Sequence, residues 1–300
     1  MRIVIVGLGI QGNKRLKVAG GDVVATVDPV APKADHKKIE DVPLGTYDAA
    51  LVCTPDDAKL SIVKFLLSSG KHVLVEKPLW APTLEKINEL RILARANGAA
   101  CYTAYNHRFE PHLVRLKEIV SKNILGPLYW VKFFYGNGTA FDVKGSPWRD
   151  RGAGVITDLG SHLADLALFL FDPKDLKLET WRLESFENRA VDYAIFASLG
   201  LPLFQFEMTL LSWKNTFRAE IFGKEGSVHV DGLCKWGPST LTLRKRVLPS
   251  GRPLEETETI ESPDPTWEKE YAHFKKLCLS GGNNLDNDLW IQSVLAKISL

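Results

Sequence analysis

Short apolar runs alternate with amphipathic stretches over the first third of the chain. The apolar runs fit buried strands, and the stretches between them carry apolar residues at the spacing of a helix. Strands that alternate with helices build a parallel sheet with right-handed crossovers. Segment 29–45 is an exception, because its prolines and charges fit a full helix poorly and favour a loop or a short helix. We therefore expect strands at 2–6, 23–27, 47–53, 72–75 and 99–104 and helices at 11–19, 57–69 and 84–97.

The pattern changes after Phe109, where strand-like runs follow one another and meet at turns that contain glycine. Such turns favour antiparallel pairing. Two helices are expected in the tail. The first has Trp267, Tyr271 and Phe274 on one face, and such a row of aromatic residues is typical of a helix that packs against the core. We also expect helices at 113–121 and 155–171 and strands at 128–135, 178–186, 192–199, 203–211, 217–222, 227–230 and 240–247.

The turn after the first expected strand fits a dinucleotide site. Gly7, Gly9 and Gly12 match G-x-G-x-x-G: the first allows a tight turn, the second lets a pyrophosphate approach the backbone, and the third lets the helix pack on the strand. The next strand ends at Asp28, whose carboxylate would accept hydrogen bonds from ribose hydroxyls and repel a 2′-phosphate. The alternative is an ordinary turn with a capping aspartate. The motif's place between strand and helix favours a dinucleotide site, and the Asp28 carboxylate favours NAD over NADP.

These patterns predict an α/β fold class with two domains. A Rossmann-type parallel sheet would occupy residues 1–108, and residues 109–300 would form an α+β domain around a large, mainly antiparallel open sheet. We expect the second domain to bind substrate and to mediate oligomerisation. The last helix is a candidate to pack back on the first domain.

Composition excludes several classes of protein. The chain has 300 residues and a formal net charge of +2, and its longest basic run, 244–246, is too short for a nucleic-acid-binding face. The four cysteines are far apart and form no C-x-x-C pair, which argues against a zinc site or a disulfide framework and suits a reducing compartment. No apolar run reaches the length of a membrane helix. The chain opens on a core strand rather than a signal peptide, so we expect a cytoplasmic protein without a membrane or nucleic-acid partner.

Polar residues follow each expected strand of the first domain. Because the carboxyl ends of parallel strands share one edge of the sheet, Gly7, Asp28, Thr54, Lys77 and Asn106 should gather there. A lysine at this edge can polarise a substrate oxygen and hold it in line for hydride transfer. The alternative is a surface lysine that follows a strand.

A second constellation lies on the helix expected at 155–171. Asp158 and His162 are four residues apart and share a face. Histidine exchanges a proton near neutral pH, as oxidation of an alcohol requires, and a nearby carboxylate can orient it or bind a substrate hydroxyl. The alternative is an acidic first turn with a solvated histidine.

Together these motifs resemble the Gfo/Idh/MocA oxidoreductases, the glucose–fructose oxidoreductase and inositol dehydrogenase group. The resemblance covers most of the chain, and its most specific motif is 158–162. It rests on the glycine loop, Val27-Asp28-Pro29, Thr54-Pro55, Glu76-Lys77-Pro78, Asn106-His107-Arg108-Phe109 and Asp158-Leu159-Gly160-Ser161-His162. Two departures are Lys59, where members often have histidine, and Trp80, where a smaller residue is usual.

The resemblance implies an NAD(P)-dependent oxidoreductase that transfers a hydride between nicotinamide and a secondary alcohol or ketone of a sugar, cyclitol or sugar nucleotide. Lys77 would bind the reacting oxygen, His162 would act as acid/base, and Asp158 would assist. It also implies a homodimer or homotetramer formed through the C-terminal sheet. The expected cofactor contacts are Gly7, Gly9, Ile10, Gln11, Gly12, Asp28, Thr54, Pro55, Glu76, Lys77 and Asn106, and the expected substrate contacts are Lys77, Arg108, Trp148, Asp158 and His162.

Two other functions fit the same scaffold. One is a non-catalytic NAD(P)-sensing regulatory protein, which would not need the lysine or the histidine. The other is an NAD-dependent glycosidase that uses transient oxidation to eliminate a glycosidic bond. The joint presence of Lys77, Asp158 and His162 favours an enzyme over a sensor.

Overall fold

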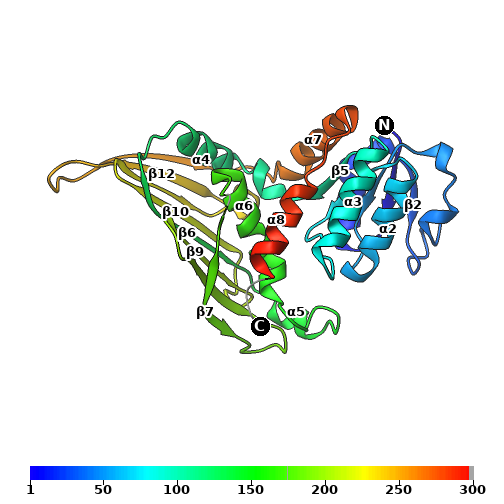
Figure 1. Ribbon diagram of the computed structural model, residues 1–300, viewed down its shortest axis with the longest axis horizontal. Helices are drawn as coiled ribbons and strands as arrows, with labels where there is room; N and C mark the ends of the chain where they lie inside the picture. The colour runs from blue at the N-terminus through cyan, green and yellow to red at the C-terminus, as the bar shows by residue number, and fades with distance from the viewer. Residues whose placement is uncertain (174, 297–300) are drawn as a thin grey trace. The chain divides into compact units, whose positions relative to one another are not determined.

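A computed structural model describes residues 1–173 and 175–296 (Figure 1). The chain divides into two compact units. The first unit comprises Met1–Asn106 and Trp267–Gln292, and the second comprises His107–Thr266 and the residues from Ser293 on. The domain boundary expected at residue 108 stays a prediction.

The first unit is built on a parallel sheet of five strands in the order β2-β1-β3-β4-β5. Its helices connect successive strands, and α2 and α3 lie side by side (Figure 1). This confirms the predicted Rossmann-type sheet. The strands are β1 (Ile3–Val6), β2 (Val23–Val27), β3 (Ala49–Val52), β4 (His72–Glu76) and β5 (Cys101–Ala104), and the helices are α1 (Ile10–Ala19), α2 (Asp56–Ser68) and α3 (Leu84–Ala96). Segment 29–45 contains only short 3₁₀ turns, at Ile39–Asp41 and from Leu44.

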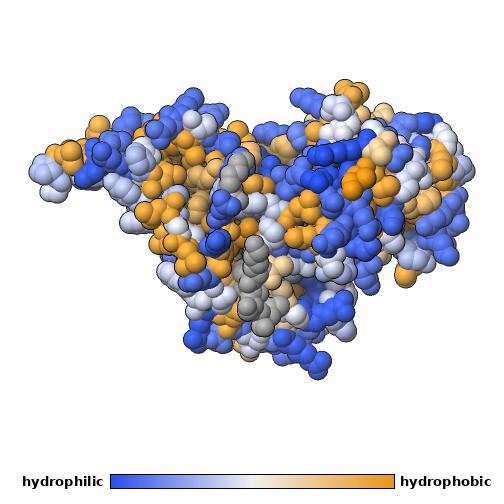
Figure 2. Space-filling model, in the orientation of Figure 1, coloured by the Kyte–Doolittle hydropathy of each residue, from blue (hydrophilic) through white to orange (hydrophobic). Residues whose placement is uncertain are grey.

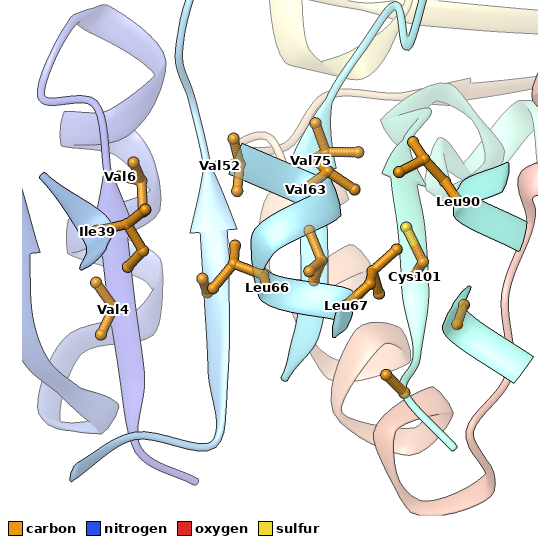
Figure 3. Close-up of a cluster of buried hydrophobic side chains, with 14 of the residues drawn as sticks. Val4, Val6, Ile39, Val52, Val63, Leu66, Leu67, Val75, Leu90 and Cys101 are labelled. Carbon is orange, nitrogen blue, oxygen red and sulfur yellow. The ribbon is translucent and has the colours of Figure 1, made fainter. Parts of the chain in front are cut away.

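Aliphatic side chains fill the space between the sheet and helix α2. Figure 3 shows Val4 and Val6 of β1 beside Ile39, and Val52 of β3 against helix α2, which carries Val63. All five side chains are buried, which explains why the strands are apolar throughout rather than alternating.

Two tail helices, α7 (Thr266–Ser280) and α8 (Leu285–Leu295), complete the first unit. Asn284 receives a hydrogen bond from the amide of Thr103 and returns one to its carbonyl, at 2.7 and 2.9 Å. Gln292 does the same with Ala81, at 3.0 and 2.7 Å. Tyr271 donates to Asp22 at 2.7 Å. The end of the expected last helix, 297–300, lies outside the described residues.

The second unit is built on an eight-stranded sheet in the order β13-β12-β11-β10-β6-β9-β8-β7. Every neighbouring pair is antiparallel except β6 with β9, which confirms the predicted, mainly antiparallel sheet. Its strands are β6 (Leu128–Gly136), β7 (Leu178–Glu184), β8 (Tyr193–Ser198), β9 (Leu203–Thr209), β10 (Thr216–Gly223), β11 (Gly226–Asp231), β12 (Ser239–Lys245) and β13 (Leu254–Ile260).

Helices α4 (Pro111–Ser121) and α6 (Ser161–Phe171) lie on one face of this sheet, and α5 (Ala140–Lys144) is a short helix in the loop after β6 (Figure 1). On β6, Val131, Phe133 and Tyr135 are buried on the helix side, whereas Trp130 on the other face is 44% exposed. Figure 2 shows hydrophobic side chains among hydrophilic ones over the large sheet.

The helix expected at 155–171 has two parts. A π-helical turn, η5 (Ile156–Gly160), comes first, and the regular helix α6 follows. A π turn is wider than an α turn and is frequent at functional sites. Asp158 thus lies in a wider turn than the regular α-helix expected there, and the shared face of Asp158 and His162 stays a prediction.

Candidate active site

The glycine loop leaves β1 and enters helix α1 in the manner its motif predicts. Gly7 has φ +91°, and a Cβ there would lie 2.8 Å from the carbonyl oxygen of Cys53. A Cβ on Gly12 would lie 1.8 Å from the carbonyl oxygen of Gly7, so the helix packs directly on the loop. A Cβ on Gly9 would meet nothing within 4 Å. Gly9 therefore borders open space at the start of α1, where a pyrophosphate group fits.

Asp28 fixes the adjoining loop. Its Oδ2 accepts a hydrogen bond from the amide of Leu8, and its Oδ1 accepts from the amides of Val30 and Ala31, each at 2.8 Å. Partial burial acts to raise the pKa of Asp28, but these three hydrogen bonds outweigh it and lower the pKa. An ionised carboxylate at this position suits ribose hydroxyls as donors.

Thr54 and Pro55 follow β3 at the same sheet edge. The Thr54 hydroxyl is buried and has no hydrogen-bond partner within 1–173 and 175–296. An unsatisfied hydroxyl beside the glycine loop is one that a bound cofactor can satisfy. The residues present therefore fit a dinucleotide.

Glu76 and Lys77 end β4. The Glu76 carboxylate accepts from Arg15 of α1 at 2.7 Å, and Arg15, which is 1% exposed, also donates to Glu270 of α7 at 2.7 Å. The Glu76 carboxylate is thus part of a buried ion-pair network, while its expected cofactor contact stays a prediction. Lys77 is half-buried, at the carboxyl edge that also holds Gly7 and Asp28.

His162 lies in a buried cluster of the second unit. Its ring stacks on that of His107, with centroids 4.1 Å apart and planes 17° apart. Tyr135 lies 5.8 Å from His162 and 5.3 Å from His107. Burial raises the pKa of Tyr135, and the charge of Asp158 raises it further, so the phenol stays neutral. Asp158 itself lies 3.7 Å from Arg149.

Arg108 forms an ion pair within the second unit. Its guanidinium donates three hydrogen bonds of 2.6 to 3.0 Å to Asp165 of α6, which is 1% exposed. Burial raises the pKa of Asp165, although Arg108 acts to lower it. This pairing anchors α6 to the segment that carries His107. The expected contact of Arg108 with substrate stays a prediction.

The structure thus gathers the predicted residues in two groups. Within the first unit, one sheet edge carries the expected cofactor residues together with Lys77. Within the second, Asp158, His162 and Arg108 belong to the α6 region, and Trp148 lies in the preceding loop with 48% of its surface exposed. The sequence did not indicate two partners of His107: the buried Tyr135 and the half-buried Lys235, whose ammonium nitrogen lies 2.9 Å from Nε2 of His107. His107 was within a quoted motif but carried no assigned role.

Two family models match the chain. Residues 1–105 match an oxidoreductase family with an NAD-binding Rossmann fold, and residues 113–229 match the Gfo/Idh/MocA C-terminal domain. The two matches lie in the two units just described. The chain belongs to the Gfo/Idh/MocA family of oxidoreductases, and its first unit is an NAD-binding Rossmann domain.

Relatives and solved structures agree with this family. YdgJ, an oxidoreductase of Escherichia coli, is 29% identical over 193 residues, which are 62% of this chain and 54% of that protein. Glucose-6-phosphate 3-dehydrogenase of Bacillus subtilis is 28% identical over 130 residues, or 42% and 37% of the two chains. The match therefore spans about half of YdgJ and about a third of the Bacillus enzyme. Levoglucosan dehydrogenase, solved with NADH, has the same fold, with a TM-score of 0.83, 17% identity and coverage of 99% and 95%.

Within the described ranges no helix is long and apolar enough to cross a membrane. The same ranges hold no group of three or more histidine, cysteine, aspartate or glutamate side chains arranged to bind a metal ion. All four cysteines are free thiols.

Proposed function

We propose that the protein is an NAD-dependent dehydrogenase or reductase that acts on a secondary alcohol or ketone of a sugar, cyclitol or sugar nucleotide. The observation that carries the proposal is the position of Lys77 directly after β4, on the sheet edge shared with the glycine loop and Asp28. A lysine at the cofactor-binding edge is placed to bind the oxygen of the carbon that exchanges a hydride.

Each candidate residue would have one task. Gly9 and the start of α1 would hold the pyrophosphate, Asp28 the adenosine ribose, and Thr54 a polar group of the cofactor. NAD, when bound, accepts or supplies the hydride. Lys77 would bind the substrate oxygen and stabilise negative charge that develops on it. His162 would take the hydroxyl proton during oxidation and return it during reduction.

A carbohydrate-like substrate is supported by two features. Trp148 exposes a flat aromatic side chain in the loop before η5, a surface suited to the apolar face of a sugar ring. Asp158, about one-third exposed, offers a carboxylate to hydroxyl groups. The name of the glucose-6-phosphate 3-dehydrogenase relative agrees with this class. The four free thiols suit a reducing compartment, which supports a cytoplasmic location.

Single-turnover absorbance at the reduced-nicotinamide band would test the proposal. The protein is mixed with NAD or NADH and a panel of sugars, cyclitols, keto-sugars and sugar nucleotides. We expect one substrate class to change the absorbance, and His162→Ala to abolish the change. His229→Ala is the matched control, because His229 contacts Ser227 and Glu220 on the large sheet instead. Cofactor binding without hydride transfer to any compound would contradict a dehydrogenase, and a glycoside-cleavage assay would then separate a glycosidase from a sensor.

A further inference from the structure

His107 and His162 cannot both be charged at low cost. Their rings stack at 4.1 Å, and their side chains are only 1% and 6% exposed. Two imidazolium ions so close together and so poorly hydrated would repel each other strongly. The pair therefore takes up one proton at a time, and catalysis depends on which ring receives it.

The contact with Lys235 determines the protonation state of His107. Its ammonium nitrogen lies 2.9 Å from Nε2 of His107. An ammonium group only donates hydrogen bonds, so Nε2 must accept with its lone pair, and the ring hydrogen resides on Nδ1. Adding a proton to Nε2 would break this hydrogen bond and place two positive charges side by side.

The surroundings of Lys235 favour its charged form. The ammonium lies 4.6 Å from the centroid of the Trp236 ring, in a cation–π contact. Glu110, buried nearby, interacts electrostatically with Lys235, which acts to lower the pKa of Glu110 against the effect of burial. Both contacts would weaken if Lys235 lost its proton.

Several ionisable groups of the second unit near the two rings are compatible with this assignment. Tyr135 contacts both rings, and its raised pKa keeps it neutral. Arg108 and Asp165 flank the rings along the chain and neutralise each other in their ion pair. Asp158 and Arg149 form a longer pair at 3.7 Å.

We propose that Lys235 and His107 direct the proton of the reaction to His162. Lys235 holds His107 as the neutral Nδ1–H tautomer, and His107 holds the His162 ring in one plane by stacking. Oxidation would break the O–H and C–H bonds of the substrate and form a C=O bond, with the proton passing to His162 and NAD, when bound, supplying the hydride acceptor. His107 is thus a positioning residue, and Lys235 acts through it. The inference rests on the proposed function of His162.

Nuclear magnetic resonance tests the tautomer without any need for turnover. In protein labelled with ¹⁵N-histidine, two-bond ¹H–¹⁵N spectra report the protonated nitrogen of each of the seven histidines, and His107→Gln assigns the signal of His107. We expect His107 to remain a neutral Nδ1–H tautomer between about pH 5 and 8 and to titrate in Lys235→Met. An ordinary titration of His107 in the wild-type protein, or no difference in Lys235→Met, would overturn the proposal.

Kinetics then test the consequence for catalysis. Lys235→Met should lower kcat about tenfold with KM and the NAD dissociation constant unchanged, and Lys235→Arg should restore most of the loss. In the His107→Gln background, where residue 107 cannot be protonated, Lys235→Met should have no further effect. An equal loss in both backgrounds would show that Lys235 acts directly on substrate and would refute the relay through His107.

Lys224→Met, an exposed turn lysine, is the control for loss of a positive charge. Absence of turnover in the wild-type protein would contradict the proposed function, whereas the spectra would still decide the state of His107.

Discussion

The ammonium group of Lys59 lies 3.0 Å from the carbonyl oxygen of Pro78 and 3.4 Å from that of Lys77. It also lies 2.6 Å from Asp56, one turn earlier on α2. Lys59 is only 3% exposed, which is unusual for lysine. This buried cation therefore ties the start of α2 to the turn that carries Lys77.

Lys59→Met tests whether this contact orients Lys77. Methionine has a similar length but donates no hydrogen bond, so we expect a loss of about 1–3 kcal/mol in the free energy of unfolding. A small displacement of Lys77 would lower kcat by about 10²-fold while NAD binding persists. Lys64→Met, on an exposed position of the same helix, is the control. Normal kcat in the folded Lys59 variant would show that the contact is only structural.

Lys77→Ala should depress kcat by about 10²–10³-fold, because the reacting oxygen would lose its cationic partner. The dissociation constant of NADH, measured by fluorescence titration, should change little. Lys86→Ala removes an exposed lysine of α3 and should leave both quantities unchanged. Near-normal turnover of Lys77→Ala would refute its catalytic role.

Gly12→Ala and Gly9→Ala should separate folding from cofactor binding. The new Cβ at residue 12 would lie 1.8 Å from the carbonyl oxygen of Gly7, so we expect a loss of stability of at least about 1–3 kcal/mol in chemical denaturation. At residue 9 the new Cβ meets no protein atom within 4 Å, so stability should change by about 1 kcal/mol or less. NAD affinity should nevertheless fall in Gly9→Ala, because the methyl group would occupy the pyrophosphate position. Unchanged affinity would contradict the proposed cofactor site.

Asp28 should make the protein prefer NAD to NADP. Its ionised carboxylate would repel a 2′-phosphate, and we expect NADH to bind at least about tenfold more tightly than NADPH. Asp28→Asn should reduce the difference between the dissociation constants of NADH and NADPH. Asp35→Asn, which removes a carboxylate bound to Thr26, should leave that difference unchanged. Tighter binding of NADPH by the wild-type protein would overturn the preference.

The open face of the eight-stranded sheet is proposed to build a homodimer or homotetramer. Trp130 lies on the face opposite the helices, 44% exposed, and its ring lies 4.4 Å from that of Phe222. Light scattering of the wild-type protein should show an oligomer, and Trp130→Glu should shift it toward monomer by placing a charge among aromatic side chains. Val24→Glu, at an exposed strand position of the first unit, is the control. A wild-type monomer at all working concentrations would contradict the proposal.

The sequence predicted best those features in which the residue pattern along the chain directly reflects burial or close packing. The apolar strands of the first unit are buried on both faces, so their pattern marked each strand and hence the sheet edge where Gly7, Asp28 and Lys77 gather. The backbone of Gly7 leaves no room for a side chain at residue 12, and the spacing of the glycine motif had already predicted this close packing. Strand β13 was missed, because its seven residues are almost wholly exposed and carry no burial pattern.

Other features depend on contacts between residues far apart in the chain. Arg15 meets Glu270, Asn284 meets Thr103, and Lys235 meets His107 only after the fold is complete. Hydrophobic period and turn chemistry describe neighbours along the chain, so they determined the sheets and the candidate residues. They hold no information on which buried polar groups will face one another. The tertiary structure alone decided those partnerships, since a buried charge or hydrogen-bonding group is stable only where a distant segment supplies its partner.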